Sequence, residues 1–171
     1  TIEPNVGLVN VPDPRLSKLE ELVKPNRTVP TQIEIVDIAG LVRGASKGEG
    51  LGNKFLANIR EVDAIIHVIR CFEDDNILRD EGPINPVGDK EIIETELQLK
   101  DLESVEKKIQ RTEKMAKTDP KAKVELEVLV RCKEHLDKGK NIITLGLTKD
   151  EKVAIADLFL LTDKQILYVA N

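Results

Sequence analysis

The sequence contains few aromatic residues, and this scarcity limits both its core and its partners. Aromatic residues make up 2% of the 171 residues, and tryptophan is absent. A buried core must therefore be built mainly from Leu, Ile and Val. Proteins that bind single-stranded nucleic acid without base selectivity stack the bases on aromatic side chains. The composition argues against a binding platform of that kind.

Cysteine is equally scarce, and long apolar runs are missing. The two cysteines, Cys71 and Cys132, lie far apart in the sequence. Disulfide frameworks and thiolate metal sites use several clustered cysteines, so we expect neither and favour a reducing, cytoplasmic location. No apolar run reaches the roughly 20 residues of a transmembrane helix, and no signal-peptide pattern opens the chain. We therefore expect no membrane partner.

Charged residues are abundant and of both signs. They make up 33% of the chain, apolar residues make up 40%, and the net charge is −5. This composition is typical of a helix-rich protein with one compact core and an appendage. The sequence gives no indication of the oligomeric state.

Hydrophobic periodicity predicts alternating strands and helices. Strands are expected at 6–11, 31–37, 64–69 and 165–170. Helices are expected from Asp13-Pro14 to Pro25, from 51 or 53 to 61, at 90–117, at 121–138, and from a capping box at 148–151 to about 158. Residues 74–89 are expected to form a loop. The continuous apolar run at 64–69 is typical of a strand buried on both faces of a parallel sheet, with His67 as a core histidine.

The two longest predicted helices carry narrow apolar stripes. In the first the stripe is Leu99, Leu102, Val105, Ile109, Thr112 and Ala116, and in the second it is Val124, Val128, Leu129, Cys132 and Leu136. Because Asp119-Pro120 turns the chain between them, we expect an antiparallel, coiled-coil-like hairpin that projects largely into solvent. The sequence therefore predicts an α/β domain of three layers interrupted by this hairpin. Its parts are 1–89 (core), 90–140 (hairpin) and 141–171 (core continued).

The clearest chemical motif is Asp37-Ile38-Ala39-Gly40, placed at the carboxyl end of a predicted strand. Ligands of open α/β sheets bind beyond such strand ends. An aspartate there can hold the water shell of Mg²⁺, and a glycine lets a backbone N–H approach a terminal phosphate. Five glycines within 40–53 then form a segment able to reorganise when the phosphate leaves. Two plainer alternatives stay open: Asp37 as a cap or turn residue, and the glycines as an ordinary surface loop.

Residues 37–53, continued by Phe55-Leu56 and 58–61, resemble the switch II region of the YchF/Obg-like ATPases. Thr1 to Asn5 resembles their switch I, 68–75 matches as well, and the resemblance covers essentially the whole chain. It implies the P-loop NTPase fold of the Ras-like, Obg type. The start of the chain looks like the interior of that domain.

The resemblance implies roles for single positions. Thr1 corresponds to a switch residue that contacts Mg²⁺, Asp37 to one that holds Mg²⁺ through water, and Gly40 to the glycine at the γ-phosphate. The remaining switch positions are Leu41, Gly44, Gly48, Gly50 and Gly52. Leu41 stands where related GTPases carry a water-orienting glutamine, and because its side chain cannot donate or accept a hydrogen bond, it is better explained as a buried switch residue. The hydrolytic group is therefore unassigned.

Asn171 resembles the first residue of the base-recognition motif and is expected to bind nucleotide. The family's altered version of that motif implies ATP, with GTP possible, but the discriminating residue is not among these 171.

Two departures from the family pattern affect activity. The phosphate-binding motif G-x-x-x-x-G-K-[ST], which in the family precedes the position of Thr1, does not occur in the sequence. Without that cradle we expect this chain alone to bind ATP very weakly and to be inactive, while the intact protein is an ATPase or GTPase. Arg79 stands near a position where many family members carry a histidine implicated in hydrolysis, and a permanently protonated arginine cannot act as a general base.

The predicted hairpin tip is strongly basic. Residues 107–123 contain seven basic side chains and two acidic ones, a local charge of +5: the basic ones are Lys107, Lys108, Arg111, Lys114, Lys117, Lys121 and Lys123. Such a tip suits an RNA backbone, although most charge runs are simply solvated. Since the family is linked to the ribosome, we expect a nucleotide switch acting in translation or the stress response, with ribosomal RNA as a possible partner of the tip. The alternative is a non-catalytic module that binds RNA or protein through the hairpin.

Overall fold

A computed structural model describes residues 5–38, 51–74, 76 and 83–171, with only the backbone for 51–54. The chain divides into two compact units, Thr1–Gly40 and Leu41–Asn171, which are described separately. Several predicted site residues lie outside the described residues: Thr1, Gly40, Leu41, Gly44, Gly48, Gly50 and Arg79.

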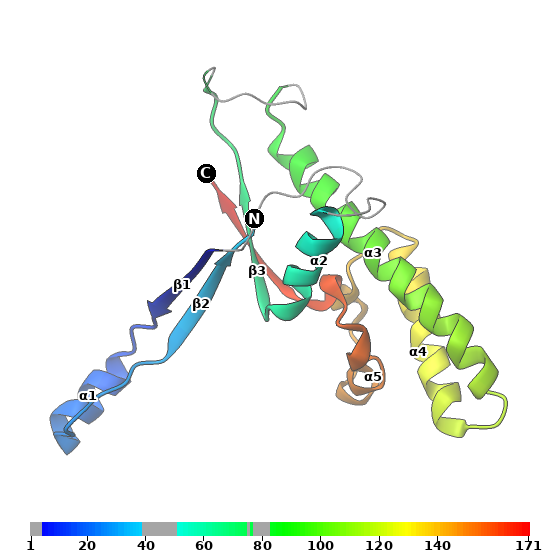
Figure 1. Ribbon diagram of the computed structural model, residues 1–171, viewed down its shortest axis with the longest axis horizontal. Coiled ribbons are helices and arrows are strands. Elements are labelled where there is room, and N and C mark those ends of the chain that lie inside the picture. Colours follow the sequence, from blue (N-terminus) through cyan, green and yellow to red (C-terminus); the bar gives the residue numbers. More distant parts are fainter. Residues whose placement is uncertain (1–4, 39–50, 75, 77–82) are drawn as a thin grey trace. The chain divides into compact units, whose positions relative to one another are not determined.

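The first unit is a strand pair joined through a helix (Figure 1). Strand β1 (Asn5–Asn10) runs antiparallel to β2 (Gln32–Asp37), with Asn5 opposite Asp37. Helix α1 (Pro14–Val23) begins where the Asp13 carboxylate accepts a hydrogen bond from the Arg15 backbone amide at 2.9 Å. It ends at Lys24, whose left-handed φ of 47° closes the last turn. The strands and helix predicted here are confirmed to within one residue, except the helix end.

The second unit contains a parallel strand pair. Strand β3 (Ala64–Ile69) pairs in parallel with β4 (Gln165–Ala170), Ala64 opposite Gln165 and Ile69 opposite Ala170. Both strands lie at the predicted positions. The prediction that β3 is buried on both faces is wrong, because Ile66 and Val68 are 54% and 59% exposed. Within the described part of the chain β3 has β4 as its one strand neighbour, so its other edge is left unpaired.

Two long helices form the predicted hairpin. Helices α3 (Pro86–Met115) and α4 (Pro120–Leu136) lie side by side and are joined by a short turn (Figure 1). Helix α3 begins four residues before the predicted start, inside the segment expected to be a loop. The Asn85 side chain caps it by accepting from the Gly88 amide at 3.1 Å, and a proline is favourable at the first helical position. Proline and glycine here mark a helix start, which explains the misplaced boundary.

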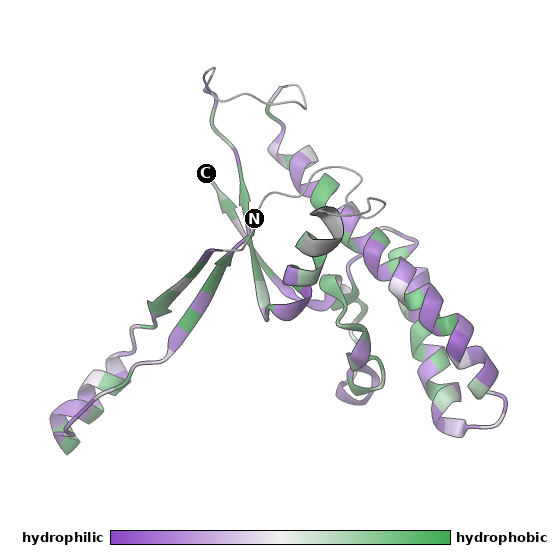
Figure 2. Ribbon diagram, viewed as in Figure 1, coloured by the Kyte–Doolittle hydropathy of each residue, from purple (hydrophilic) through white to green (hydrophobic). Residues whose placement is uncertain are grey.

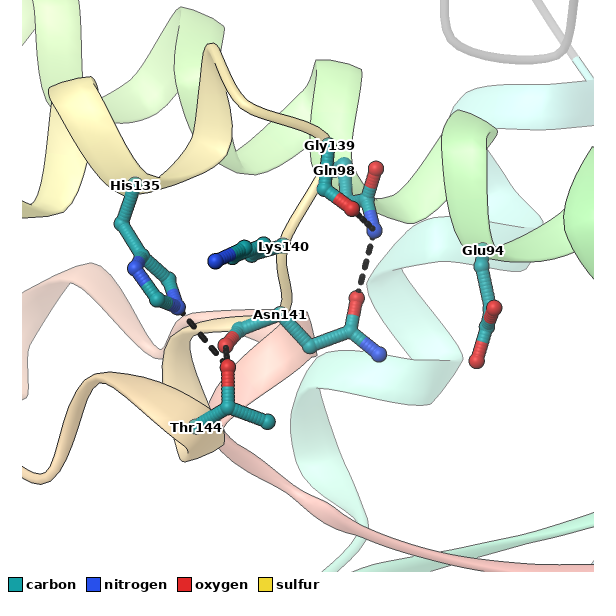
Figure 3. A pocket seen from close by; sticks show the side chains of 7 residues that line it. All are labelled: Glu94, Gln98, His135, Gly139, Lys140, Asn141 and Thr144. Atoms are coloured by element: carbon teal, nitrogen blue, oxygen red, sulfur yellow. Dashed lines mark hydrogen bonds between the residues drawn. The ribbon is translucent and has the colours of Figure 1, made fainter.

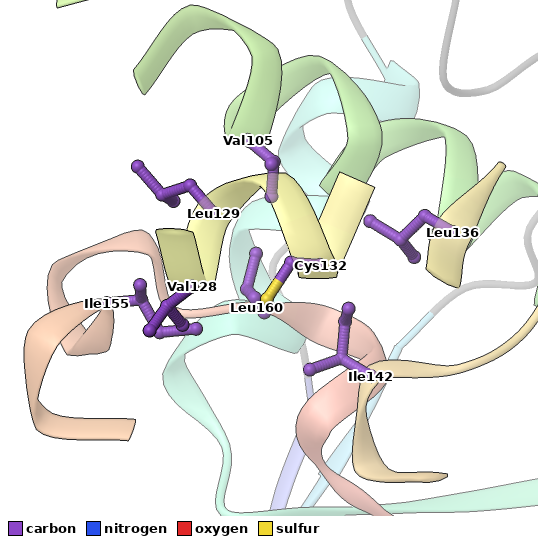
Figure 4. Close-up of a cluster of buried hydrophobic side chains, with 8 residues drawn as sticks. All are labelled: Val105, Val128, Leu129, Cys132, Leu136, Ile142, Ile155 and Leu160. Carbon is purple, nitrogen blue, oxygen red and sulfur yellow. The ribbon is translucent and has the colours of Figure 1, made fainter. Parts of the chain in front are cut away.

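The main hydrophobic cluster lies at the base of this hairpin (Figure 4). It combines helix residues with residues of the segment that follows: Val105, Val128, Leu129, Cys132, Leu136, Ile142, Ile155 and Leu160. The following segment consists of the short turns η1 (Ile142–Leu145), η2 (Ala156–Leu158) and η3 (Leu161–Asp163) together with helix α5 (Lys149–Ala154). The base of the hairpin is therefore covered, whereas most residues of its tip are exposed, so the expected projection into solvent applies to the tip and not to the base.

Two stripe residues are displaced from the predicted core. Leu99 and Val124 are 40% and 58% exposed, and Leu97 and Ala122 are buried in their helices instead. Hydrophilic residues cover much of the outer surface of both helices (Figure 2). The predicted capping box is confirmed: the Thr148 hydroxyl accepts from the Glu151 amide at 3.3 Å, and the Glu151 carboxylate accepts from the Thr148 amide at 2.8 Å. None of the helices described is long and apolar enough to cross a membrane.

Candidate functional site

Asp37 is the last residue of β2, at the carboxyl end of that strand, and it is exposed. Within the part of the chain that the structure describes, its carboxylate forms no hydrogen bond or ion pair. The location predicted from the sequence is confirmed, and its role in binding stays a prediction. An exposed carboxylate at a strand end is accessible to a cation or its water shell.

A single such carboxylate is what an outer-sphere magnesium site requires of this chain. Among the residues described, no group of three or more His, Cys, Asp or Glu side chains could hold a metal. Mg²⁺ in nucleotide sites keeps several waters and is bound by one or two protein groups together with phosphate oxygens. Asp37 fits the role of one such protein group. Thr1, the other predicted ligand, lies outside the described residues.

Asn171 continues the parallel ladder one step past β4. Its amide donates to the Ile69 carbonyl at 2.9 Å, and its own carbonyl accepts from the Cys71 amide at 2.7 Å. Because parallel strands share a carboxyl edge, Asn171 lies at the same edge as the residues that follow β3. Its side chain is exposed. The predicted nucleotide-binding residue is therefore accessible at a sheet edge suited to ligands.

Arg70, a residue that no motif in the sequence marks, binds the residues just after β3. The Arg70 guanidinium donates to the carbonyls of Phe72 and Asp74, both at 3.1 Å, and lies over the Phe72 ring at 4.8 Å. The signal in the sequence is an arginine placed directly after an apolar strand, too common a feature to be recognised alone.

Helix α2 (Leu51–Glu61) follows the predicted switch and contains Gly52 in its first turn. Its inner face is buried through Leu56 and Ile59. At its end, the Arg60 guanidinium donates to the Ser104 hydroxyl of α3 at 3.0 Å. The Lys164 ammonium donates to the Arg60 carbonyl at 3.1 Å. The helix that would follow the switch is thus fastened to the hairpin and to the segment before β4.

The seven basic residues of the predicted tip differ in their availability. The Lys107 ammonium is paired with Glu103, whose pKa is lowered to about 2 by its hydrogen bonds from Lys100 and Lys107. The Lys108 ammonium is paired with Glu125 at 2.6 Å and with Asp157. The other five are exposed and, in the described part of the chain, without an ion-pair partner: Arg111, Lys114, Lys117, Lys121 and Lys123.

A shallow pocket of about 410 Å³ lies at the hairpin base (Figure 3). The Gln98 side-chain amide donates to the Asn141 side-chain oxygen at 2.7 Å and to the Gly139 carbonyl at 3.3 Å. His135 Nε2 lies 2.8 Å from the Thr144 hydroxyl. These polar groups bond to one another and hold the start of η1 against the helices.

Next to this pocket, α3 is tied to β4. The Tyr168 hydroxyl donates to the Glu94 carboxylate, and the Lys90 ammonium lies 5.1 Å from the centre of the Tyr168 ring. Burial and the Glu94 carboxylate raise the pKa of Tyr168 to about 12. His67, expected in the core, is half-buried beside Tyr168 with the ring centres 5.7 Å apart, and burial lowers its pKa.

The sequence of this chain is similar to those of known proteins. A family model described as "50S ribosome-binding GTPase" matches residues 12–130. Proteins named ribosome-binding ATPase YchF are similar over the full chain: that of Escherichia coli O157:H7 is 56% identical and that of Bacillus subtilis 54%. The chain covers 47% of each of these relatives, so it spans about half their length.

A solved structure shares the fold. The YchF GTPase of Schizosaccharomyces pombe matches with a TM-score of 0.81 and 38% identity, over 100% of this chain and 47% of that one. The likeness confirms the predicted fold class, an incomplete P-loop NTPase core of α/β type that carries a helical hairpin.

Proposed function

Since the chain belongs to the YchF/Obg-like family of P-loop NTPases, we propose that the intact protein is a nucleotide-dependent switch that binds ATP or GTP with Mg²⁺ and hydrolyses it slowly. The observation that carries this proposal is the exposed Asp37 carboxylate at the carboxyl end of β2, which has no partner among the described residues. The exposed Asn171 at the carboxyl edge of the other strand pair supports it.

Asp37 and Asn171 have different roles in the proposed function. Asp37 orients water of the Mg²⁺ shell, and Mg²⁺ neutralises charge on the phosphates when bound. Asn171 contacts the base. The phosphate cradle is expected from residues outside this sequence, because the motif that forms it does not occur here. The 171-residue chain alone therefore binds nucleotide very weakly.

The names of the relatives differ in the nucleotide that they give. The bacterial relatives are named ATPases, whereas the fission-yeast relative is named a GTPase. We propose ATP as the preferred nucleotide, with GTP accepted, on the resemblance to the family. Competition of unlabelled ATP and GTP for a bound fluorescent ATP analogue distinguishes the two, and stronger competition by GTP would reverse the assignment.

Calorimetric titration tests the central claim. The intact protein is expected to bind Mg-ATP or Mg-GTP with micromolar affinity, and the 171-residue chain is expected to give no measurable heat. Micromolar binding by the short chain would contradict the assignment of the phosphate cradle to residues outside it. Absence of binding by the intact protein would contradict the switch function itself.

We further propose that the hairpin tip contacts ribosomal RNA. The bacterial relatives are named ribosome-binding. The five exposed basic residues without ion-pair partners among the described residues can each approach a phosphate, whereas Lys107 and Lys108 are already paired with carboxylates. We therefore assign the contact to those five. A ribosomal partner would place the protein in the cytoplasm, and cell fractionation tests that location.

A non-catalytic role is the second candidate. The five exposed cations of the hairpin, which have no ion-pair partner among the described residues, favour it, because they can bind RNA or protein without any nucleotide. The two candidates differ in one measurement: a binding module would sediment with ribosomes equally in the presence and absence of nucleotide and would show no hydrolysis.

A further inference from the structure

Arg70, the first residue after β3, makes a compact set of contacts with the residues that follow it. Its Nε donates to the Phe72 carbonyl and its Nη2 to the Asp74 carbonyl, both at 3.1 Å, while the guanidinium carbon lies 4.8 Å from the centre of the Phe72 ring. A guanidinium is a planar fork that can donate to two acceptors and stack at the same time. A lysine ammonium can do only part of this.

The Asp74 side chain forms further contacts at the far end of the same turn. Asp74 accepts from the Asn76 backbone amide at 2.9 Å and from its side-chain amide at 3.0 Å. These bonds lower the pKa of Asp74 below its usual range. Arg70 and Asp74 together set the path of the chain as it leaves the sheet.

This turn adjoins the residue expected to recognise the base. The Cys71 amide, one residue after Arg70, donates to the Asn171 carbonyl at 2.7 Å, and the Asn171 amide donates to the Ile69 carbonyl at 2.9 Å. Asn171 is thus attached on both sides to the backbone around Arg70. A shift of the turn would move the Asn171 backbone and the direction of its side chain.

We propose that Arg70 is a positioning residue for the nucleotide base: by bridging two carbonyls and stacking on Phe72 it holds the turn that fixes Asn171. This inference rests on the proposed nucleotide-binding function. Because hydrolysis is slow, KM for the nucleotide approximates its dissociation constant. Loss of positioning at the base therefore acts on KM and leaves the chemical step unchanged.

The test uses steady-state kinetics of the intact protein carrying Arg70→Lys. KM for the preferred nucleotide is expected to rise about tenfold at a nearly unchanged kcat, the order expected for losing one hydrogen bond from a charged donor. Phe72→Leu, which removes the stacking but keeps the carbonyl, is expected to raise KM less. Arg131→Lys is the matched control, since Arg131 lies in α4 and is paired with Glu151.

A second measurement reports the turn directly. The Cys71 thiol is exposed. Its alkylation by iodoacetamide, followed by mass spectrometry of the Cys71 peptide, is expected to be faster in Arg70→Lys than in the wild type without nucleotide. This readout follows one peptide, so other cysteines of the intact protein do not affect it.

The kinetic and alkylation results can each contradict the positioning role of Arg70. Unchanged KM and an unchanged Cys71 rate in Arg70→Lys, with an active wild type, would overturn the positioning role alone. A fall in kcat at constant KM would overturn it as well, since that pattern places Arg70 at the chemical step. A wild type that binds no nucleotide would overturn both this role and the proposed function. Should circular dichroism show that Arg70→Lys is unfolded, the Phe72→Leu kinetics decide, and an unchanged KM there refutes the proposal.

Discussion

The Asp101 carboxylate of α3 accepts hydrogen bonds from both the amide and the hydroxyl of Thr162, each at 2.7 Å. It also accepts from the Leu161 amide at 2.9 Å, while the Thr162 hydroxyl oxygen accepts from the Ile142 amide at 3.2 Å. Asp101 and Thr162 are both buried. One carboxylate thus satisfies the backbone of η3 and fixes the segment that leads into β4.

Replacing Asp101 tests the importance of this contact. Asp101→Asn turns one acceptor into a donor that faces the Leu161 or the Thr162 amide, and it is expected to lower the free energy of unfolding by about 1–3 kcal/mol. Urea denaturation measures the change. The control is Asp150→Asn, an exposed residue in the first turn of α5, for which a change under about 1 kcal/mol is expected. Equal effects of the two substitutions would contradict a structural role for Asp101.

The cluster at the hairpin base predicts a large effect of a core truncation. Leu129 is 0% exposed, and Leu129→Ala is expected to cost about 2–5 kcal/mol through lost burial and the cavity left behind. Val124→Ala, on an exposed side of the same helix, is expected to change stability by under about 0.5 kcal/mol. The comparison is made by thermal or urea unfolding, and similar losses for both would show that the core has been misplaced.

The tip prediction concerns charge at the end of the hairpin. Combined Lys114→Glu, Lys117→Glu and Lys121→Glu substitutions in the intact protein are expected to abolish salt-sensitive co-sedimentation with ribosomes, because each lost phosphate contact lowers the salt dependence of binding by about one unit of log–log slope. The control reverses three exposed lysines outside the tip, Lys138, Lys140 and Lys149.

Ribosome binding that is equally weak in both triple variants would reflect net charge only. Unchanged binding in the tip variant would remove the tip from the interface.

The magnesium prediction concerns Asp37. Asp37→Asn in the intact protein is expected to lower nucleotide hydrolysis by roughly 10–100-fold, the range for losing a group that orients a metal's water shell. Titration with Mg²⁺ should show a higher concentration for half-maximal rate. Glu34→Gln provides the matched control, since Glu34 is also an exposed carboxylate on β2. A normal rate and normal Mg²⁺ dependence in Asp37→Asn would refute the assignment.

The pH prediction concerns Tyr168. Its pKa of about 12 in the folded protein lies above the ordinary value because the hydroxyl is partly buried and donates to Glu94. Since the folded state holds the proton more tightly than the unfolded state, the stabilisation is fully present below about pH 10. It is lost as pH rises through about 12.

The phenolate absorbance, taken as the difference between the wild type and Tyr168→Phe, measures this pKa. Glu94→Gln is expected to shift the titration toward the ordinary range. Titration of Tyr168 near its ordinary pKa in the wild type would show that the contact with Glu94 is weak.

Most elements of the fold could be predicted because their local signals were strong. The Asp13-Pro14 start of α1 and the capping box at Thr148 are satisfied as the residue types require. The start of α3 was missed because Pro86 and Gly88 are read first as loop residues, whereas a proline also fits the first turn of a helix.

Burial was harder to predict than secondary structure. The apolar pattern of β3 indicates that its side chains avoid water, but it cannot show which part of the chain covers them. Likewise, the stripe on α4 predicted the buried residues Leu129 and Cys132, while its covering by η1, η2 and α5 depends on contacts distant in sequence.

The sequence predicted where two candidate site residues lie, and it did not predict the role of a third. A strand end occupied by Asp and the edge residue Asn171 follow from the sequence, because strand direction fixes where their backbones lie. Arg70 could not be found this way, since its importance comes from carbonyls that only the folded turn brings within reach.

The concentration of fully buried side chains at the hairpin base has a consequence for local opening of the molecule. Amide protons of α4 around Leu129 and Cys132 should exchange with solvent most slowly, through global unfolding. The backbone at the carboxyl ends of β2 and β4, where side chains are exposed, should exchange through much smaller fluctuations. Local opening would then reach the carboxyl ends of β2 and β4 long before it reaches the hairpin base, which opens only when its own unit unfolds.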